Sequence, residues 1–280
     1  MTRPEAHPES VGLIGLGAMG RPVAGFLARA GLPTYCYDED RAVLDDAADD
    51  GARPTASVPE LAAASGVILV MVPSDQDVLD VCSPATGVLS AARPGSVLLI
   101  CSSVTPDTCR AVARQAAPRG VHVLDAALTG GVRAAEAGGI NLLVGGDEPT
   151  LDRIRPRLAP WTSTVHHLGP LGSGQIGKTV NNLCHWGQLS AIVEALRLGR
   201  ALGVAPAKLR AALLDGPAAS RTIAEMEQMR LTWHRKDLAN ALLMAADAGQ
   251  ELPVAAVVRE AMEHITVADI AGLYAEGSSG

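Results

Sequence analysis

The chain has 280 residues, which is enough for two domains of moderate size. Hydrophobic residues make up 48% and charged residues 19%, a balance that is typical of globular proteins and excludes a disordered or low-complexity chain. The net charge of −7 argues against a nucleic-acid binder, because phosphate contacts require a basic face.

The first 168 residues alternate short apolar runs with longer segments of helical period. The expected strands are 11–15, 33–37, 67–72, 97–101, 121–126, 140–145 and 164–168, and the expected helices include 18–30, 41–50, 106–117 and 150–158. Apolar runs without polar alternation are typical of a sheet that is covered on both faces. Alternating strands and helices predict parallel βαβ units, and therefore a doubly wound α/β domain over residues 1–168.

A glycine-rich turn, Gly-Leu-Gly-Ala-Met-Gly at residues 15–20, follows the first expected strand and opens the first helix. In a dinucleotide site Gly15 would allow the tight turn, Gly17 would let a pyrophosphate approach the backbone, and Gly20 would let the helix pack against the strand. Free N–H groups and the helix dipole favour phosphate at such a helix start. The strand before and the helix after supply the context that this motif needs, with a ligand-free turn as the alternative.

Three acidic residues, Asp38, Glu39 and Asp40, follow the second expected strand. Asp38 suits hydrogen bonds from the hydroxyls of an adenosine ribose. The three carboxylates would repel a 2′-phosphate, and no arginine is placed to hold one, so we prefer NAD as the cofactor and leave NADP open. Asp40 is placed to cap the helix that begins at Arg41.

A Gly/Pro-rich break at residues 168–174 ends the alternation of strands and helices. One long helix is expected over about 175–202, with an apolar stripe of Leu189, Ile192, Val193 and Leu196. Shorter helices should follow over 206–215, 220–230, 235–249 and 254–268. The sequence thus predicts an all-helical domain over residues 169–280.

Lys178, one turn inside the long helix, is one of three lysines in a chain with twenty arginines. A partly desolvated lysine can give up its proton near neutral pH, whereas arginine cannot. Asn182 at i+4 and His185 at i+7 project from the same helix face. A proton donor beside an amide suits the reduction of a carbonyl to an alcohol. A solvated polar stripe is the alternative, and for His185 we prefer a structural role.

The five cysteines form no Cys-x-x-Cys pair and have no clustered histidine partners: Cys36, Cys82, Cys101, Cys109 and Cys184. We therefore expect reduced thiols and no metal site. The first ten residues have no apolar stretch that would indicate a signal peptide, and no apolar run approaches the ~20 residues that span a bilayer. These features predict a soluble, cytoplasmic protein.

Six motifs occur in an order that is typical of one enzyme family. They are the glycine turn, Met71-Val72-Pro73, Ser102-Ser-Val-Thr-Pro106, Asp125-Ala-Ala-Leu-Thr-Gly-Gly131, Gly172-Ser-Gly-Gln-Ile-Gly-Lys-Thr-Val-Asn-Asn182 and Lys236-Asp237-Leu238. Over nearly its whole length the chain resembles the β-hydroxyacid dehydrogenase family, which includes 3-hydroxyisobutyrate dehydrogenase, tartronate semialdehyde reductase and the related 6-phosphogluconate dehydrogenases.

The resemblance implies a Rossmann-type domain followed by an all-α substrate and dimerisation domain, in a homodimer or homotetramer. It implies that Lys178 is the general acid/base and that Asn182 holds the substrate. Ser102, Thr129, Gly130 and Gly131 would bind the substrate carboxylate. The implied cofactor site comprises Gly15, Leu16, Gly17, Ala18, Met19, Gly20, Asp38, Met71, Val72, Pro73, Ser102 and Lys236, with Asp237 beside Lys236; a surface pair is the alternative for Lys236.

The sequence departs from the family pattern at a few positions. Ile100 stands where the family has Asp, and Ala127 and Thr129 replace the usual Pro and Ser. The helix face after Lys178 carries Cys184, His185 and Trp186, and Trp233 precedes Lys236 by three residues. The two tryptophans either line the pocket or serve ordinary packing. These departures bear on the substrate more than on the reaction.

We therefore predict an NAD-dependent oxidoreductase that interconverts a small 3-hydroxy acid and its semialdehyde or ketone. An imine reductase of the same fold is one alternative, although its usual Asp or Tyr proton donor is replaced here by Lys178 and the asparagine pair. A non-catalytic NAD-binding protein is the other. Neither nucleic acid nor a membrane is expected as a partner.

Overall fold

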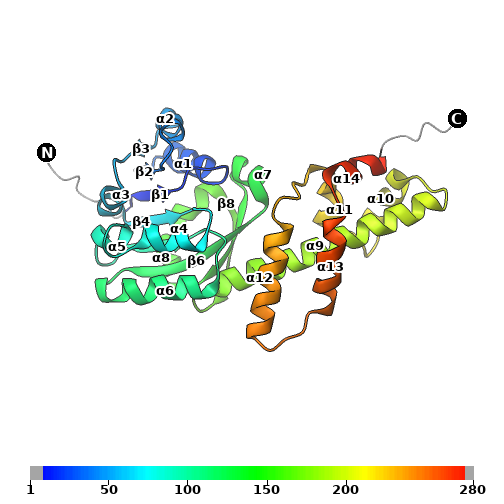
Figure 1. The fold of residues 1–280 in the computed structure, drawn as a ribbon. Coiled ribbons are helices and arrows are strands. Elements are labelled where there is room, and N and C mark those ends of the chain that lie inside the picture. Colours follow the sequence, from blue (N-terminus) through cyan, green and yellow to red (C-terminus); the bar gives the residue numbers. More distant parts are fainter. Residues whose placement is uncertain (1–8, 275–280) are drawn as a thin grey trace. The chain divides into compact units, whose positions relative to one another are not determined.

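The computed structural model describes residues 9–274. Residues 1–8, part of the segment in which no signal peptide is expected, lie outside the described residues, as do residues 275–280. The chain divides into two compact units, residues 1–178 and residues 179–280 (Figure 1). The division falls within helix α9 (Ser173–Ala201). The predicted division after residue 168 precedes this helix and remains a prediction.

The first unit is built on one eight-stranded sheet with the strand order β3-β2-β1-β4-β5-β6-β7-β8. The strands are β1 (Val11–Ile14), β2 (Thr34–Tyr37), β3 (Arg53–Pro54), β4 (Val67–Val70), β5 (Val97–Ile100), β6 (His122–Thr129), β7 (Ile140–Gly145) and β8 (Thr162–Gly169). The sequence predicted all of them except β3. This strand has only two residues and contains Pro54, which an edge strand tolerates because its missing N–H faces outward.

The pairing is parallel from β3 through β6, but β6 and β7 pair antiparallel. The prediction of parallel βαβ units was therefore wrong for the last part of the sheet. The reason is the connection: only residues 130–139 join β6 to β7, whereas a parallel crossover needs a dozen residues or more. Strand β8 then pairs parallel with β7.

Eight α-helices pack around this sheet within the described residues. They are α1 (Gly20–Arg29), α2 (Arg41–Asp49), α3 (Val58–Ala64), α4 (Asp75–Cys82), α5 (Val88–Ala91), α6 (Pro106–Ala116), α7 (Gly131–Glu136) and α8 (Glu148–Leu158). Helices α3, α4, α5 and α7 were not predicted, because they are too short to show a clear period. A capping signal marks α3, where Ser57 accepts from the Glu60 N–H and Glu60 accepts from the Ala56 N–H.

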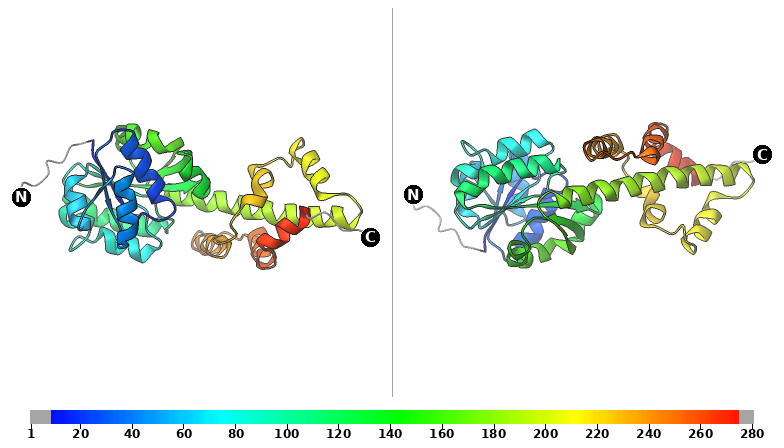
Figure 2. Two further views of the ribbon diagram at one scale, coloured as in Figure 1. Left: turned by 90° about the horizontal axis from the view of Figure 1, so that it is seen from above. Right: turned by 90° about the horizontal axis from the view of Figure 1, so that it is seen from below.

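The sheet is covered on both faces, as the unbroken apolar runs predicted (Figure 2). Alternate residues of each central strand enter two separate buried clusters: in β4, Val67 and Leu69 belong to one cluster and Ile68 and Val70 to the other. Helices α1 and α8 pack on the first cluster, and α3, α4 and α6 on the second. This double cover fixes the carboxyl ends of β1, β4, β5 and β6 along one edge.

The second unit is all-helical over its described residues. It contains the later part of α9, then α10 (Pro206–Leu214), α11 (Arg221–Glu225), α12 (His234–Asp247), α13 (Pro253–Glu263) and α14 (Val267–Tyr274), with a short 3₁₀ helix at Met226–Gln228. The predicted stripe of α9 contributes Leu189, Val193 and Leu196 to the core of this unit, with Ile192 packed against it.

The helix predicted over 254–268 is α13, which ends earlier, at Glu263, and a further helix that was not predicted, α14, follows it. The break is set by Thr266, whose hydroxyl accepts from the Asp269 N–H at 3.1 Å while the Asp269 carboxylate accepts from the Thr266 N–H at 2.9 Å. This reciprocal cap starts a new helix at Val267. Across residues 9–274, no helix has the length and the apolar character needed to cross a membrane.

Candidate active site

The glycine turn lies between β1 and α1, at the carboxyl edge of the sheet. Gly15 has a φ of +92°, and a Cβ there would lie 2.5 Å from the carbonyl oxygen of Met71. A Cβ at Gly20 would overlap the carbonyl oxygen of Gly15, whereas a Cβ at Gly17 would have no heavy atom within 4 Å. Packing of the chain itself therefore explains Gly15 and Gly20. Gly17 instead borders open space, the arrangement that close approach of a pyrophosphate requires.

Helix α1 starts at Gly20, two residues later than predicted, so residues 15–19 form the turn. Its N-cap residue Met19 makes no side-chain capping hydrogen bond, and the first turn contains no acidic residue. The backbone N–H groups at this helix start and the positive end of the helix dipole are thus arranged for an anion. Together with the space at Gly17, these residues fit a dinucleotide.

Asp38 follows β2 and is half-buried beside this turn. Its Oδ2 accepts from the Leu16 N–H at 2.7 Å, and its Oδ1 accepts from the Asp40 N–H at 2.9 Å. The carboxylate therefore holds the glycine turn in place as well as lying next to it. Asp40 accepts from the Ala42 N–H at 2.9 Å and caps α2, which confirms its predicted structural role.

Met71, Val72 and Pro73 follow β4, and the loop after β5 lies beside them because β4 and β5 are neighbours in the sheet. The Met71 N–H donates to the Ile14 carbonyl at 2.8 Å, which ties this turn to the end of β1. The buried Ser102 hydroxyl accepts from the Val72 N–H at 2.8 Å and donates to the Val70 carbonyl at 3.3 Å. Ser102 therefore joins the predicted cofactor turn to the predicted substrate loop.

Thr129, Gly130 and Gly131 lie at the end of β6 and the start of α7. Gly130 has a φ of +105° and Gly131 a φ of +67°, values that favour glycine over any other residue. A Cβ at Gly130 would lie 2.5 Å from that of Ala134, whereas one at Gly131 would border open space. The Thr129 hydroxyl donates a long hydrogen bond of 3.4 Å to the Asn141 carbonyl.

Asp125 is fully buried on β6, and its side chain binds the backbone at the start of α9. Its Oδ1 accepts from the Gly172 N–H at 2.6 Å and its Oδ2 from the Gln175 N–H at 2.9 Å. Burial raises the pKa of this carboxyl, and the Gly172 and Gln175 N–H groups act against that rise. The carboxylate thus caps the helix that carries Lys178 in its second turn.

Lys178 and Asn182 lie four residues apart on α9 and therefore on one side of that helix. Asn181 donates to the Asn182 side-chain oxygen at 3.1 Å. Further along the helix, the His185 ring is 3.0 Å from the Thr222 hydroxyl. This contact supports the structural interpretation of His185.

Trp186 is buried in the core of the helical unit. Its Nε1–H donates to the Asp237 carboxylate at 3.0 Å, which ties α9 to the first turn of α12, where Lys236 also lies. The His185 and His234 rings pack on Trp186 with centroids 4.5 and 5.9 Å away. Trp233, by contrast, is 62% exposed.

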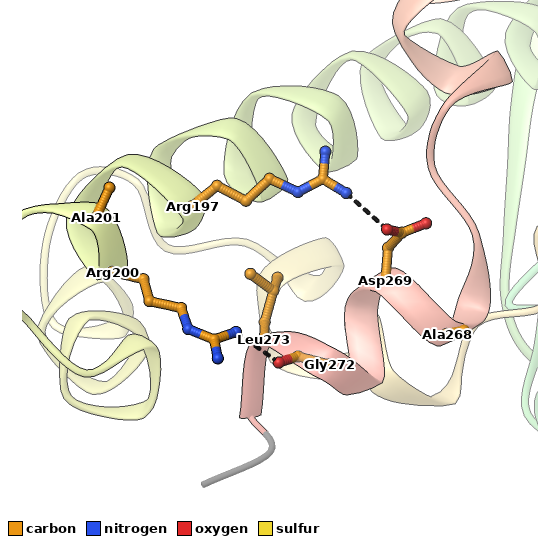
Figure 3. A pocket seen from close by; sticks show the side chains of 7 residues that line it. All are labelled: Arg197, Arg200, Ala201, Ala268, Asp269, Gly272 and Leu273. Carbon is orange, nitrogen blue, oxygen red and sulfur yellow. Dashed lines mark hydrogen bonds and ion pairs between the residues drawn. The ribbon is translucent and has the colours of Figure 1, made fainter. Parts of the chain in front are cut away.

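A hollow of about 610 Å³ lies between α9 and α14 in the same unit (Figure 3). Arg197 pairs with Asp269 at 3.0 Å, and Arg200 donates to the Gly272 carbonyl at 2.8 Å. Hydrogen bonds from Thr266 and the charge of Arg197 lower the pKa of Asp269. The hollow contains none of the predicted site residues, and its arginines hold α14 on α9.

Three further residues near the carboxyl ends of the strands have structural roles that the sequence did not reveal. Ile100 is fully buried in the apolar cluster under α6, so it packs the core beneath the loop. Gln175 and Asp75 were not among the predicted site residues. Asp75 accepts from the Thr105 N–H at 2.8 Å and from the Thr108 hydroxyl at 2.6 Å, joining the α4 and α6 starts. Their positions inside or beside the quoted motifs were the available signal.

Two family models cover the chain. The NAD-binding domain of 6-phosphogluconate dehydrogenase matches residues 10–169. The NAD-binding region of NADP-dependent 3-hydroxyisobutyrate dehydrogenase matches residues 172–273.

Similar proteins agree with these matches. The chain is 31% identical over 266 residues to a 2-(hydroxymethyl)glutarate dehydrogenase from Eubacterium barkeri, covering 90% of this chain and 88% of that protein. A solved structure of Mycobacterium tuberculosis 3-hydroxyisobutyrate dehydrogenase with L-serine is 28% identical, with a TM-score of 0.83 and coverage of 91% and 93%. A Streptomyces aurantiacus imine reductase shares the fold alone, at 20% identity, a TM-score of 0.64 and coverage of 94% and 99%.

The fold and these matches define a nicotinamide-dependent oxidoreductase with a Rossmann-type domain followed by an all-helical one. The chain belongs to the β-hydroxyacid dehydrogenase family, which the sequence motifs predicted, and its relatives act on CH–OH groups of hydroxy acids.

Proposed function

We propose that the protein is an NAD-dependent dehydrogenase that interconverts a small 3-hydroxy acid and its semialdehyde or ketone. The observation that carries this proposal is that the predicted cofactor and substrate loops lie next to one another at the carboxyl ends of the strands. The glycine turn after β1, the loops after β4 and β5, and the Gly130–Gly131 turn after β6 lie on neighbouring strands. Phosphate-binding geometry thus stands beside hydroxyl and N–H donors that suit a carboxylate.

The substrate would be held by Ser102, Thr129, Gly130 and Gly131. The Ser102 and Thr129 hydroxyls donate only long hydrogen bonds, of 3.3 and 3.4 Å, which they can exchange for a carboxylate oxygen. The two glycines offer backbone N–H groups in conformations that suit an anion. Charge-assisted hydrogen bonds of this kind are about twice as strong as neutral ones.

Lys178 would take the hydroxyl proton as the alcohol is oxidised and return it in the reverse direction, and Asn182 would orient the hydroxyl. The nicotinamide, when bound, supplies the acceptor for the hydride of the carbinol carbon. The cofactor would be held by the following residues: Gly15, Leu16, Gly17, Ala18, Met19, Gly20, Asp38, Met71, Val72, Pro73, Ser102 and Lys236.

The preference for NAD over NADP rests on Asp38. Its carboxylate lies 2.7 Å from the Leu16 N–H, so a ribose next to the glycine turn would meet a hydrogen-bond acceptor. A 2′-phosphate would meet the negative charges of Asp38 and of the exposed Glu39 and Asp40.

We also propose that residues 1–168 bind the dinucleotide and that residues 169–280 serve the substrate and dimerisation, in a cytoplasmic homodimer or homotetramer. Exposed apolar side chains of the helical unit support self-association: Leu202, Val254, Val257 and Leu243 are each at least 66% exposed. Light scattering coupled to size exclusion measures the oligomer directly, and a monomer at micromolar concentration contradicts this part.

The test of the function is the formation of reduced nicotinamide, with NAD and NADP in parallel, over a panel of 3-hydroxy acids. The panel contains 3-hydroxyisobutyrate, 2-(hydroxymethyl)glutarate and L-serine, which share a CH₂OH group next to the carbon that carries the carboxylate. Turnover with NAD on one of them supports the proposal. NAD binding without turnover on hydroxy acids, but with reduction of imines, would favour the imine reductase alternative, and binding with neither would favour a non-catalytic protein.

A further inference from the structure

Gln175 lies on α9 three residues before Lys178, with its side chain almost fully buried. Buried glutamine is uncommon, because its amide loses hydrogen bonds to water unless the protein replaces them. Here both ends of the amide have protein partners. Oε1 accepts from the Val104 N–H at 3.2 Å, and Nε2 donates to the Ser102 carbonyl at 2.9 Å.

These two hydrogen bonds join α9 to the loop after β5. The same loop holds the turn after β4, because the Ser102 hydroxyl accepts from the Val72 N–H at 2.8 Å. A continuous set of contacts therefore runs from the helix turn before Lys178, through Ser102, to Val72. All of these residues belong to the first unit, residues 1–178.

We propose that Gln175 is a positioning residue that sets the place of Lys178 relative to the Ser102 loop. This inference rests on the proposed roles of Lys178 and Ser102. The support of the helix itself comes from Asp125, which accepts from the Gly172 and Gln175 backbone N–H groups. Changing the Gln175 side chain leaves those backbone bonds in place and removes its two hydrogen bonds to the loop.

At neutral pH an uncharged amide can both accept from the Val104 N–H and donate to the Ser102 carbonyl. A glutamate could accept from the Val104 N–H, but its carboxylate would face the Ser102 carbonyl without a proton to donate. A methionine has similar length and apolar volume, and it makes neither bond. The pair of variants therefore separates the hydrogen bonds from the packing.

In Gln175→Met, kcat should fall by about 10- to 100-fold, since a displacement of about 1 Å between reacting groups can cost 10²-fold. The dissociation constant of NAD should change little, because the glycine turn is untouched. The primary deuterium isotope effect on kcat should rise as hydride transfer becomes slower than product release. A partly unfolded enzyme would lose rate without any change in the isotope effect.

Gln175→Glu supplies a rescue that a purely structural role does not predict. As the pH falls, a protonated glutamic acid regains the donor for the Ser102 carbonyl. Its kcat should therefore recover relative to Gln175→Met at low pH. Ser65→Ala is the matched control: Ser65 is buried and donates to the Leu61 carbonyl at 2.7 Å, at the opposite edge of the sheet.

A readout that does not depend on turnover separates this inference from the proposed function. The chain has only Lys178, Lys208 and Lys236, so protein labelled with [ε-¹³C]lysine gives three assignable signals. The Lys178 signal should move in Gln175→Met while the Lys208 signal stays, and none should move in Ser65→Ala.

An unmoved Lys178 signal, or a wild-type kcat and isotope effect in Gln175→Met, overturns the positioning role while leaving the dehydrogenase proposal intact. A moved Lys178 signal in a protein that oxidises no hydroxy acid supports the link to the loop and refutes the proposed function instead.

Discussion

Alanine at Gly17 and at Gly20, one at a time, separates a glycine needed by a ligand from a glycine needed by the fold. At Gly20 a Cβ would overlap the Gly15 carbonyl oxygen, a backbone atom that can move only if α1 shifts away from β1. Overpacking of this kind costs about 1–3 kcal/mol of unfolding free energy. At Gly17 a Cβ would have no neighbour within 4 Å, so the stability of Gly17→Ala should stay within about 1 kcal/mol of wild type.

The affinity for NAD should fall in both variants, but for different reasons. In Gly17→Ala the added methyl would stand where the pyrophosphate approaches, and we expect a loss of at least about tenfold, equivalent to about 1.4 kcal/mol. Urea unfolding gives the stability of each variant and titration calorimetry gives the affinity. If Gly17→Ala binds NAD as tightly as wild type, the pyrophosphate does not approach this residue and the placement of the cofactor is wrong.

Asp38→Ala should weaken NAD binding more than NADP binding and lower the NAD/NADP affinity ratio by about tenfold or more. An unchanged ratio contradicts the ribose role. Burial raises the pKa of Asp125, so protonation of this carboxyl stabilises the folded state. That stabilisation is fully present below the pKa of 3.8 in the unfolded chain, and the free energy of unfolding falls as the pH rises through the raised pKa. Unfolding measured across this range should show that decline, and Asp125→Asn should flatten it. Trp186→Phe should cost about 1.5–3 kcal/mol, because the lost hydrogen bond is to the Asp237 carboxylate, and an unchanged unfolding midpoint would argue against that bond.

The features that were predicted correctly depend on patterns among residues close together in the sequence. The glycine turn and the Asp40 cap depend on residues within a few positions of one another, and the buried strands depend on short apolar runs. The direction of β7 could not be predicted in this way, because a run of apolar residues does not show whether a strand pairs parallel or antiparallel with its neighbour. Only the short connection over residues 130–139 shows that β7 must turn back.

The residues that long-range contacts define were the hardest to predict. Gln175 bonds to Ser102 across 73 positions, and Asp125 bonds to Gly172 across 47. A glutamine in a helix is ordinarily exposed, so no periodicity marks Gln175 as buried. The predicted site residues were instead found through motifs. A motif identifies positions but not their contacts, so it did not reveal that the Ser102 hydroxyl accepts from the Val72 N–H.

The central claim is that Lys178 handles the proton of the substrate hydroxyl, and the direct measurement is the turnover of Lys178→Ala with NAD and the best 3-hydroxy acid. Lys208→Ala, an exposed lysine on α10, is the matched control. We expect kcat to fall by about 10²–10⁴-fold in Lys178→Ala with NAD affinity retained, and to stay at the wild-type value in Lys208→Ala. Wild-type turnover in Lys178→Ala would contradict the assignment of the general acid/base.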